Sequence, residues 1–222
     1  MLSTIIFTVI KTTLTKVDYM INLTVLSLEV EMDKKYHHGD LKIQLIKTGL
    51  HMIQEDGINK LSLRKLAQLC NVSEAAPYSH FKNKGELLIA IQEYITEQLQ
   101  KCLEDAYERT EHSNSPIAIL NMGKVYVQFF IRYPEYYSFL FTQPYLKIDL
   151  SMGNEPNAFE PFQYYKEKAY TIYKNEGFSE ERIKYGIIAM WVKVHGIAAI
   201  ASMQGVNRDF EWEDVLDKIL VE

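Results

Sequence analysis

The chain has 222 residues, and its 47% hydrophobic content is enough to bury a core, which excludes disorder over most of its length. Its two cysteines form neither a disulfide framework nor a metal-binding pair, so we expect a reducing, cytoplasmic setting. The net charge of −5 is unevenly spread: residues 33–90 carry nine Lys/Arg against six Asp/Glu, and residues 91–222 carry 13 against 20. This asymmetry favours a nucleic-acid-binding N-terminal part joined to an acidic remainder.

Residues 1–32 are rich in Thr, Val, Ile and Leu, but their apolar runs are too short to span a bilayer. They lack the basic start and the small-residue cleavage site of a signal peptide, and no transmembrane helix is expected after them. We therefore expect no membrane partner and interpret residues 1–32 as a disordered extension, with Met32 opening the helical pattern. The alternative is a short β-prone arm that packs on the protein or touches DNA.

The first two helices of the N-terminal part are marked by apolar spacing and by capping residues. Apolar residues recur at three- and four-residue steps from Asp40, which predicts a helix that stops at Gly57. Ser62 is a suitable N-cap for a second, short helix over residues 63–69, whose apolar positions form one stripe.

A tight turn and a third short helix follow. Asn71 is one of the few non-glycine residue types that accept the left-handed conformation such a turn needs. Ser73 is suited to cap a helix over residues 74–80, which Pro77 would shorten and stiffen. Two short helices around a tight turn indicate a helix-turn-helix, in which the second helix enters the major groove of DNA.

The remainder of the chain is predicted to be helical as well. Asn83 and Glu86 form a capping box that opens a long helix reaching about residue 109. Ser115 is placed as the N-cap of another helix, with Pro116 at its first position and residue 132 near its end. Gly and Pro residues predict a mobile loop at 147–156. Further helices are expected from Glu135 and over residues 159–175, 179–204 and 211–221.

The predicted fold class is all-α, because no strand-like alternation appears after residue 32. We expect about nine helices, arranged as an N-terminal three-helix head and a C-terminal helical bundle. The predicted domains are the helix-turn-helix head over residues 33–90 and a ligand-binding and dimerisation body over residues 91–222.

Small and hydrogen-bonding side chains gather on the third predicted helix of the head. Ala75 and Ala76 leave room for close approach to DNA. Phosphates or base edges are the expected partners of Tyr78, Ser79 and His80, and phosphates those of Lys82 and Lys84. The alternative is an ordinary helical hairpin in which Tyr78 and Phe81 are core residues; we accept this for Phe81 and expect a phosphate contact for Tyr78.

Several motifs in the head resemble the DNA-binding domain of the tetracycline-repressor (TetR) family. They are Gly57, Leu61-Ser62-Leu63-Arg64-Lys65-Leu66-Ala67, Asn71-Val72-Ser73 and Tyr78-Ser79-His80-Phe81-Lys82-Asn83-Lys84-Gly85-Glu86-Leu87-Leu88. The resemblance implies backbone or base contacts for Ser62, Ser73, Tyr78, His80 and Lys84. Glu74 departs from the family pattern, in which this position is often basic or small. The full candidate DNA-binding set is Ser62, Arg64, Ser73, Ala75, Ala76, Tyr78, Ser79, His80, Lys82 and Lys84.

The body resembles the WHG-type C-terminal domain found in one subgroup of that family. The matching segments are Tyr133-Pro134-Glu135-Tyr136-Tyr137 and Trp191-Val192-Lys193-Val194-His195-Gly196. The motif does not identify what the subgroup senses.

The body is also rich in aromatic residues, which predicts an apolar pocket with a few orienting hydroxyl groups. Plain core packing is the alternative for any single ring. Trp191 and His195 lie four residues apart and are expected on one helix face. The candidate ligand-binding residues are Phe130, Tyr133, Tyr137, Phe141, Phe162, Tyr165, Trp191 and His195.

Residues 195–202 are dense in small side chains, which allow another helix to approach closely. With the helix at 211–221, we interpret this stretch as a homodimer surface; close packing inside one subunit is the alternative. A two-fold dimer would place two recognition helices on half-sites about 34–36 Å apart, or a multiple of that distance, and implies a roughly palindromic operator.

No catalytic constellation appears: the sequence has no phosphate-binding glycine loop, no Gly-x-Ser-x-Gly and no His-Glu-x-x-His. His37 and His38 with Asp40 rarely make a closed metal site, so no metal and no cofactor are expected. The sequence predicts a DNA-binding transcriptional regulator, and the resemblance to the TetR family implies a repressor that a small apolar or aromatic ligand releases from DNA. The alternative is a helical adaptor whose helix-turn-helix contacts protein.

Overall fold

The computed structural model describes residues 41–110, 114–142 and 146–221. The interpretations of residues 1–32 and of His37, His38 and Asp40 fall outside these ranges. Within them the chain forms eight α-helices and two short 3-10 helices without any strand, so the all-α fold class is confirmed.

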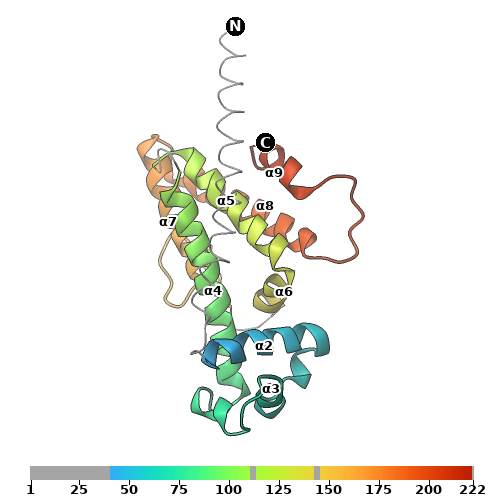
Figure 1. The fold of residues 1–222 in the computed structure, drawn as a ribbon. Helices are drawn as coiled ribbons and strands as arrows, with labels where there is room; N and C mark the ends of the chain where they lie inside the picture. Colours follow the sequence, from blue (N-terminus) through green and yellow to red (C-terminus); the bar gives the residue numbers. More distant parts are fainter. Residues whose placement is uncertain (1–40, 111–113, 143–145, 222) are drawn as a thin grey trace.

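The head comprises α2 (Leu41–Asp56), the 3-10 helix η1 (Ile58–Lys60), α3 (Leu63–Leu69) and the 3-10 helix η2 (Ala76–Ser79), seen at the lower end of Figure 1. Gly57 has φ of 80°, a conformation that glycine adopts without strain, and it ends α2 as predicted.

The third helix of the head differs from the predicted α-helix over residues 74–80. Only Ala76–Ser79 is helical, and it is a 3-10 helix. Pro77 has no amide hydrogen to donate to the carbonyl of Ser73, so the segment keeps the tighter bonds from Ala76 N to Ser73 O and from Tyr78 N to Ala75 O. Asn71 adopts φ of 55°, which confirms the left-handed turn before it.

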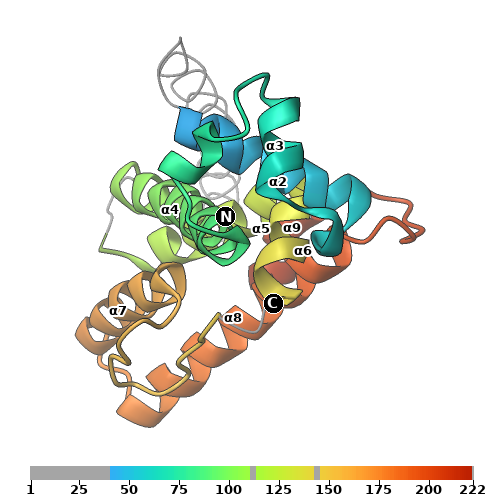
Figure 2. The ribbon, with the colours of Figure 1, turned by 90° about the horizontal axis from the view of Figure 1, so that it is seen from below.

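The body is built from six helices, and α4 links it to the head (Figures 1 and 2). Its elements are α4 (Lys84–Glu108), α5 (Pro116–Arg132), α6 (Pro134–Thr142), α7 (Glu160–Asn175), α8 (Glu180–Ala201) and α9 (Trp212–Val221).

Three of the predicted helix N-caps make the expected hydrogen bonds. Ser62 accepts from the amide of Lys65, Asn83 from that of Glu86, and Ser179 from that of Arg182. The Glu86 carboxylate reaches one residue further back than a capping box requires, because it accepts from the amide of Lys82 at 2.8 Å. Ser115 occupies the predicted N-cap position but makes no side-chain cap bond.

Helix α5 lies at the centre of the body and packs against α4, α7, α8 and α9. Eleven of its residues are buried, including Phe129 and Phe130. One buried cation, Lys124, forms an ion pair with Asp217 and so ties α9 to α5. The core is therefore organised around α5.

Helix α8 is the element of the described chain that is long and apolar enough to cross a membrane by length and composition, a property it shares with core helices. One face of α8 is buried in the bundle, through residues such as Ile187, Trp191 and Val194. Contacts with α5, α7 and α9 account for the apolar composition of this face.

Candidate nucleic-acid interface and aromatic core

The outer edge of the helix-turn-helix presents predicted contact residues to solvent. Tyr78 on η2 is 56% exposed, whereas a tyrosine of the core would be buried. His80 and Lys82 follow it, both exposed, with 86% of the Lys82 side chain accessible. These exposed side chains, which follow one another along the chain, carry a hydroxyl, an imidazole and an ammonium group, and we refer to them as the exposed edge of the head.

Buried side chains hold this edge in place from behind. Phe81 is 2% exposed and Pro77 is buried, so the residues on either side of Tyr78 anchor η2 in the head core. Leu66 and Ala67 of α3 are fully buried in that core as well. The core role predicted for Phe81 is confirmed, and the exposure of Tyr78 fits the phosphate contact rather than packing.

Other predicted contact residues are engaged within the head. Arg64 donates from Nε to Glu74 at 2.8 Å, and both side chains are more than half exposed. The Lys84 ammonium donates to the carbonyl oxygen of Ile58, which ties the start of α4 to η1. Ser79 donates its hydroxyl hydrogen to the carbonyl of Ala76 at 2.7 Å. Glu74 thus has a local partner, and Lys84 has a structural bond in addition to any role on DNA.

The remaining members of the predicted set lie at helix ends. Ser62 is exposed and caps α3, while Ser73 and Ala75 are exposed in the turn before η2. Ala76 is half-buried at the start of η2. Most of the set therefore lies on α3, on η2 and on the turn between them, while Lys82 and Lys84 follow η2 and lie at or just before the start of α4.

The predicted ligand residues meet around His195 in the body. Tyr126 of α5 contacts His195 Nδ1 at 3.0 Å, and Tyr137 of α6 contacts Nε2 at 3.1 Å. Since a neutral imidazole has one donor and one acceptor nitrogen, one tyrosine donates to the ring and the other accepts from it. The two hydroxyls therefore satisfy a neutral His195 on both sides.

Aromatic rings enclose this hydrogen-bonded group. Trp191 stacks on His195 at 5.3 Å between ring centroids, and Phe141 lies edge-on at 4.5 Å. Phe162 contacts Trp191 at 4.5 Å, and Phe130 contacts Tyr137 at 5.3 Å. The rings pack directly on one another in this arrangement.

Two predicted members lie at the margin of this cluster. Tyr165 stacks on Phe162 at 6.3 Å, and Tyr133 stacks on Tyr136 at 4.8 Å, on the side of Phe129. Tyr126, which sequence reasoning missed, contacts His195 directly. Tyr126 could have been found from its position four residues before Phe130, because this spacing places both rings on one face of a helix.

Burial keeps the central groups of the cluster neutral. It lowers the pKa of His195 below its ordinary value of 6.5, because the imidazolium would lose hydration there. Burial also raises the pKa of Tyr126 well above 10.0, and the neighbouring Tyr137 adds to the effect. The cluster is therefore suited to uncharged groups.

The small-residue stretch of α8 has two different faces. Ile197 and Ala198 are buried within the subunit. Gly196 faces open space, since an added Cβ there would meet nothing within 4 Å. The same outer face carries Val192, 62% exposed, and Ile200, 45% exposed. Close packing inside one subunit and an unpartnered apolar face therefore coexist on one helix.

A helix-turn-helix head with an exposed polar edge, mounted on a helical bundle, defines the architecture of a DNA-binding regulator. Comparisons with known proteins agree. The family model described as "Bacterial regulatory proteins, tetR family" matches residues 45–91. An uncharacterized HTH-type transcriptional regulator of Haemophilus influenzae is 32% identical over 72 residues, which span 32% of this chain and 38% of that relative.

Solved structures share the whole fold. A TetR/AcrR-family transcriptional regulator from Thermobifida fusca is similar with a TM-score of 0.59 at 14% identity, over 82% of this chain and 96% of that one. A TetR variant from Acinetobacter baumannii, in complex with minocycline, is similar with a TM-score of 0.51 at 20% identity, over 80% and 92% of the two chains. The match to the tetR-family model thus covers residues 45–91, and the solved structures show that the chain shares the fold of TetR/AcrR-family regulators.

Proposed function

We propose that the chain is a DNA-binding transcriptional regulator, a cytoplasmic repressor that a small ligand releases from its operator. The observation that carries this proposal is the exposed edge of Tyr78, His80 and Lys82, held on buried Pro77 and Phe81. A rigid, solvent-facing edge with hydrogen-bonding and cationic groups is what the phosphate backbone and the major groove require. We propose no catalytic role and no cofactor.

DNA binding is tested with the purified full chain and DNA from just upstream of its own gene, at two salt concentrations. Binding should weaken as salt rises, because each neutralised phosphate releases counterions. Lys82→Ala should reduce the slope of log affinity against log salt by about 1. The exposed Lys174 on α7 gives the matched control, and Lys174→Ala should leave the slope unchanged. Salt-independent binding would contradict phosphate recognition.

The rival function is a helical adaptor whose head contacts protein. Tyr78→Ala separates the two functions, because a phosphate contact predicts loss of DNA affinity at every sequence tested. The adaptor function would be favoured if the folded chain binds no DNA under any condition but captures one protein partner, and if Tyr78→Ala no longer captures that partner.

The outer face of α8 supports a homodimer. Tyr185, Val192, Ile200 and Met203 are each at least 45% exposed and recur at helical spacing. Two-fold pairing of this face with its copy, together with α9, would bury these side chains and place two heads on a palindromic operator. Val192→Glu tests the pairing by sedimentation, and a variant that remains fully dimeric would contradict it.

The aromatic cluster around His195 is the proposed ligand site, built from Phe130, Tyr137, Phe141, Phe162 and Trp191, with Tyr133 and Tyr165 at its margin. An apolar or aromatic ligand that separates these rings would move α6 relative to α8 and bias the position of the heads. A ligand that occupies the cluster, yet leaves operator affinity unchanged, would contradict this coupling.

A further inference from the structure

The segment that leads from α6 to α7 has no helix or strand in its described part, residues 146–159, and we refer to this part as the strap. It runs between α7 and α8 in the view of Figure 2. Between its first residue and its last two, every residue except Asp149 and Met152 is exposed. The exposed residues include Ile148 at 38% and Leu150 at 43%. Burial of apolar surface therefore contributes little to holding the strap in place.

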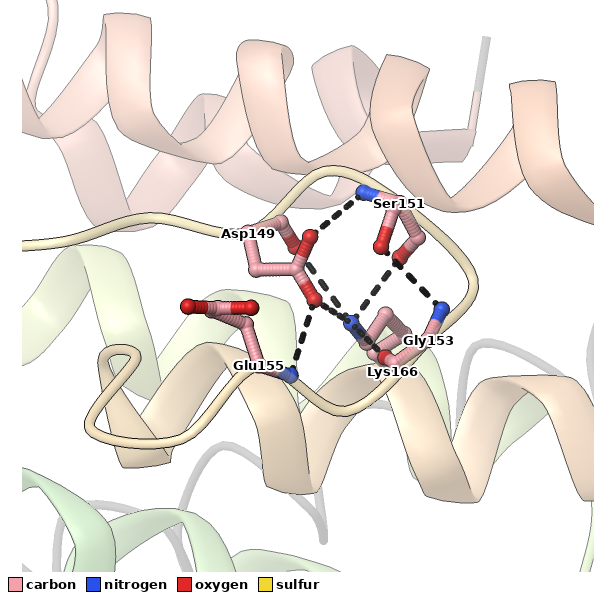
Figure 3. Close-up of polar contacts among 5 residues, drawn as sticks. All are labelled: Asp149, Ser151, Gly153, Glu155 and Lys166. Atoms are coloured by element: carbon pink, nitrogen blue, oxygen red, sulfur yellow. Dashed lines mark hydrogen bonds and ion pairs between the residues drawn. The ribbon is translucent and has the colours of Figure 1, made fainter.

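The ammonium group of Lys166 on α7 holds the strap instead (Figure 3). The Lys166 side chain is 7% exposed, and its Nζ lies 3.0 Å from the carboxylate of Asp149. The same ammonium donates to the carbonyl oxygens of Ser151 at 2.9 Å and Gly153 at 2.7 Å. Hydrogen bonds that involve a charged group are roughly twice as strong as neutral ones. We refer to Lys166 and these three partners as the clasp.

The strap itself prepares Asp149 for this cation. The amide of Ser151 donates to the Asp149 carboxylate at 2.9 Å. Hydrogen bonds from Ser151 and from Lys166 hold the pKa of Asp149 well below its ordinary value of 3.8. The carboxylate is therefore charged at neutral pH, and the clasp joins three positions of the strap to one helix through a single cation.

The end of the strap reaches into the aromatic cluster. The amide of Phe159 donates to the carbonyl oxygen of Lys147 at 2.7 Å, which ties the two ends of the strap together. The Phe159 side chain is 3% exposed. The centre of its ring lies 5.9 Å from that of Phe141 and 6.2 Å from that of Trp191. Phe159 thus covers the cluster from the side of the strap.

The aromatic cluster is closed in this arrangement. Phe162 is fully buried and Trp191 is 7% exposed, so an element has to move before a ligand reaches these rings. The other described elements that contact the cluster are α5, α6, α7 and α8, and each packs against neighbouring helices. The strap depends on the clasp, whose Lys166 Nζ lies 6.0 Å from the centre of the Phe162 ring. Among these elements the strap is therefore the one that opens at least cost.

We propose that the strap is the gate of the aromatic cluster: when Lys166 separates from Asp149, the strap lifts and withdraws Phe159, which opens a path for a neutral aromatic ligand. As a ligand gate it rests on the ligand site proposed above, whereas the opening motion can be measured without any ligand.

The opening motion is tested by acrylamide quenching of Trp191 fluorescence in a Trp212→Phe background, which leaves one tryptophan in the chain. Lys166→Met and Asp149→Asn each remove the charge-assisted contact of the clasp. The open fraction should rise roughly tenfold, and the quenching constant several-fold. The matched control is Lys174→Met, which breaks an exposed ion pair between α7 and α8 outside the strap and should leave quenching unchanged.

Amide hydrogen exchange locates the motion within the chain. In Lys166→Met, residues 146–159 should exchange faster, while the amides of α8 around Trp191 keep their rates. Equally accelerated exchange in α8 would show a general loosening of the body and would contradict a gate.

Admission of a ligand is tested by stopped-flow fluorescence with N-phenylnaphthylamine, a neutral aromatic probe. In Lys166→Met, association and dissociation should both be roughly tenfold faster with little change in affinity, because the clasp closes the strap in the free and in the bound state alike. Phe159→Ala, which keeps the clasp and removes the covering ring, should also bind the probe faster.

The two proposals fail in different ways. A probe that does not bind the unmodified chain would contradict the ligand site, and quenching would still decide the gate. Lys166→Met and Asp149→Asn change opposite partners of the clasp, so a variant that fails to fold by circular dichroism leaves the other to decide. The gate is overturned if the folded clasp variants are quenched like Lys174→Met, or if the probe binds them at the rate of the unmodified chain.

Discussion

The hydroxyl of Tyr126 is predicted to hold the centre of the body together. It is fully buried in the bundle and contacts His195 Nδ1 at 3.0 Å. Tyr126→Phe removes this group while keeping the ring, whose contacts with Trp191 at 5.2 Å and with Phe130 at 5.0 Å are unaffected. The substitution therefore isolates one hydrogen bond.

The expected loss follows from the state of the imidazole. A neutral bond contributes about 1 kcal/mol net, and a buried ring nitrogen left without a partner costs about 1–3 kcal/mol. His195 is only half-buried, so water reaches part of the ring and the lower end of the range applies. We expect a loss of about 1.5 kcal/mol, which lowers the melting temperature of a chain of this size by about 3–6 °C.

The assay is urea denaturation of the unmodified chain, Tyr126→Phe and the control Tyr78→Phe, whose hydroxyl lies on the exposed edge of the head. The control should change the free energy of unfolding by less than about 0.5 kcal/mol. In a His195→Leu background, Tyr126→Phe should have little further effect. If Tyr126→Phe matches the control, or costs the same in both backgrounds, the reasoning about this hydrogen bond is refuted.

Three further substitutions test other parts of the structure. Because burial lowers the pKa of His195 below 6.5, the unfolded chain takes up the proton first; stability is full above that pH and falls as pH drops below it. In urea denaturation, His195→Phe should reduce the loss of unfolding free energy between pH 7.5 and pH 5.5. A loss equal to that of the unmodified chain would contradict this prediction. Ser62→Ala removes the cap on the Lys65 amide and should lower the free energy of unfolding by about 1 kcal/mol in urea denaturation, and an unchanged free energy would contradict a stabilising cap. Lys124→Met removes the cation that pairs with Asp217 and leaves this carboxylate beside an apolar α5. We expect faster amide hydrogen exchange over residues 212–221 of α9. Unchanged exchange rates would contradict a stabilising role of the ion pair.

Local signals predicted most of the helices. Apolar periodicity and capping residues such as Ser62, Asn83 and Ser179 depend on neighbours in sequence, and the structure confirms their cap bonds. The type of the third head helix was not predictable from periodicity alone, because the missing amide of Pro77 decided between α and 3-10 bonding. Its residues were still identified, since the head is contiguous in sequence.

The sites of the body depend on contacts between distant segments. His195 and Tyr137 were expected to share a site, but Tyr126 lies 69 residues from His195, and only packing of α5 on α8 brings them together.

The most direct test of DNA recognition is selection of bound sequences from a random duplex pool with the purified full chain. Enrichment of one sequence, as an inverted repeat with half-sites about one helical turn apart, is expected from two paired heads. Tyr78→Ala should abolish the enrichment while the protein remains folded. A pool that stays random with the unmodified, folded chain would contradict the claim that the head reads DNA.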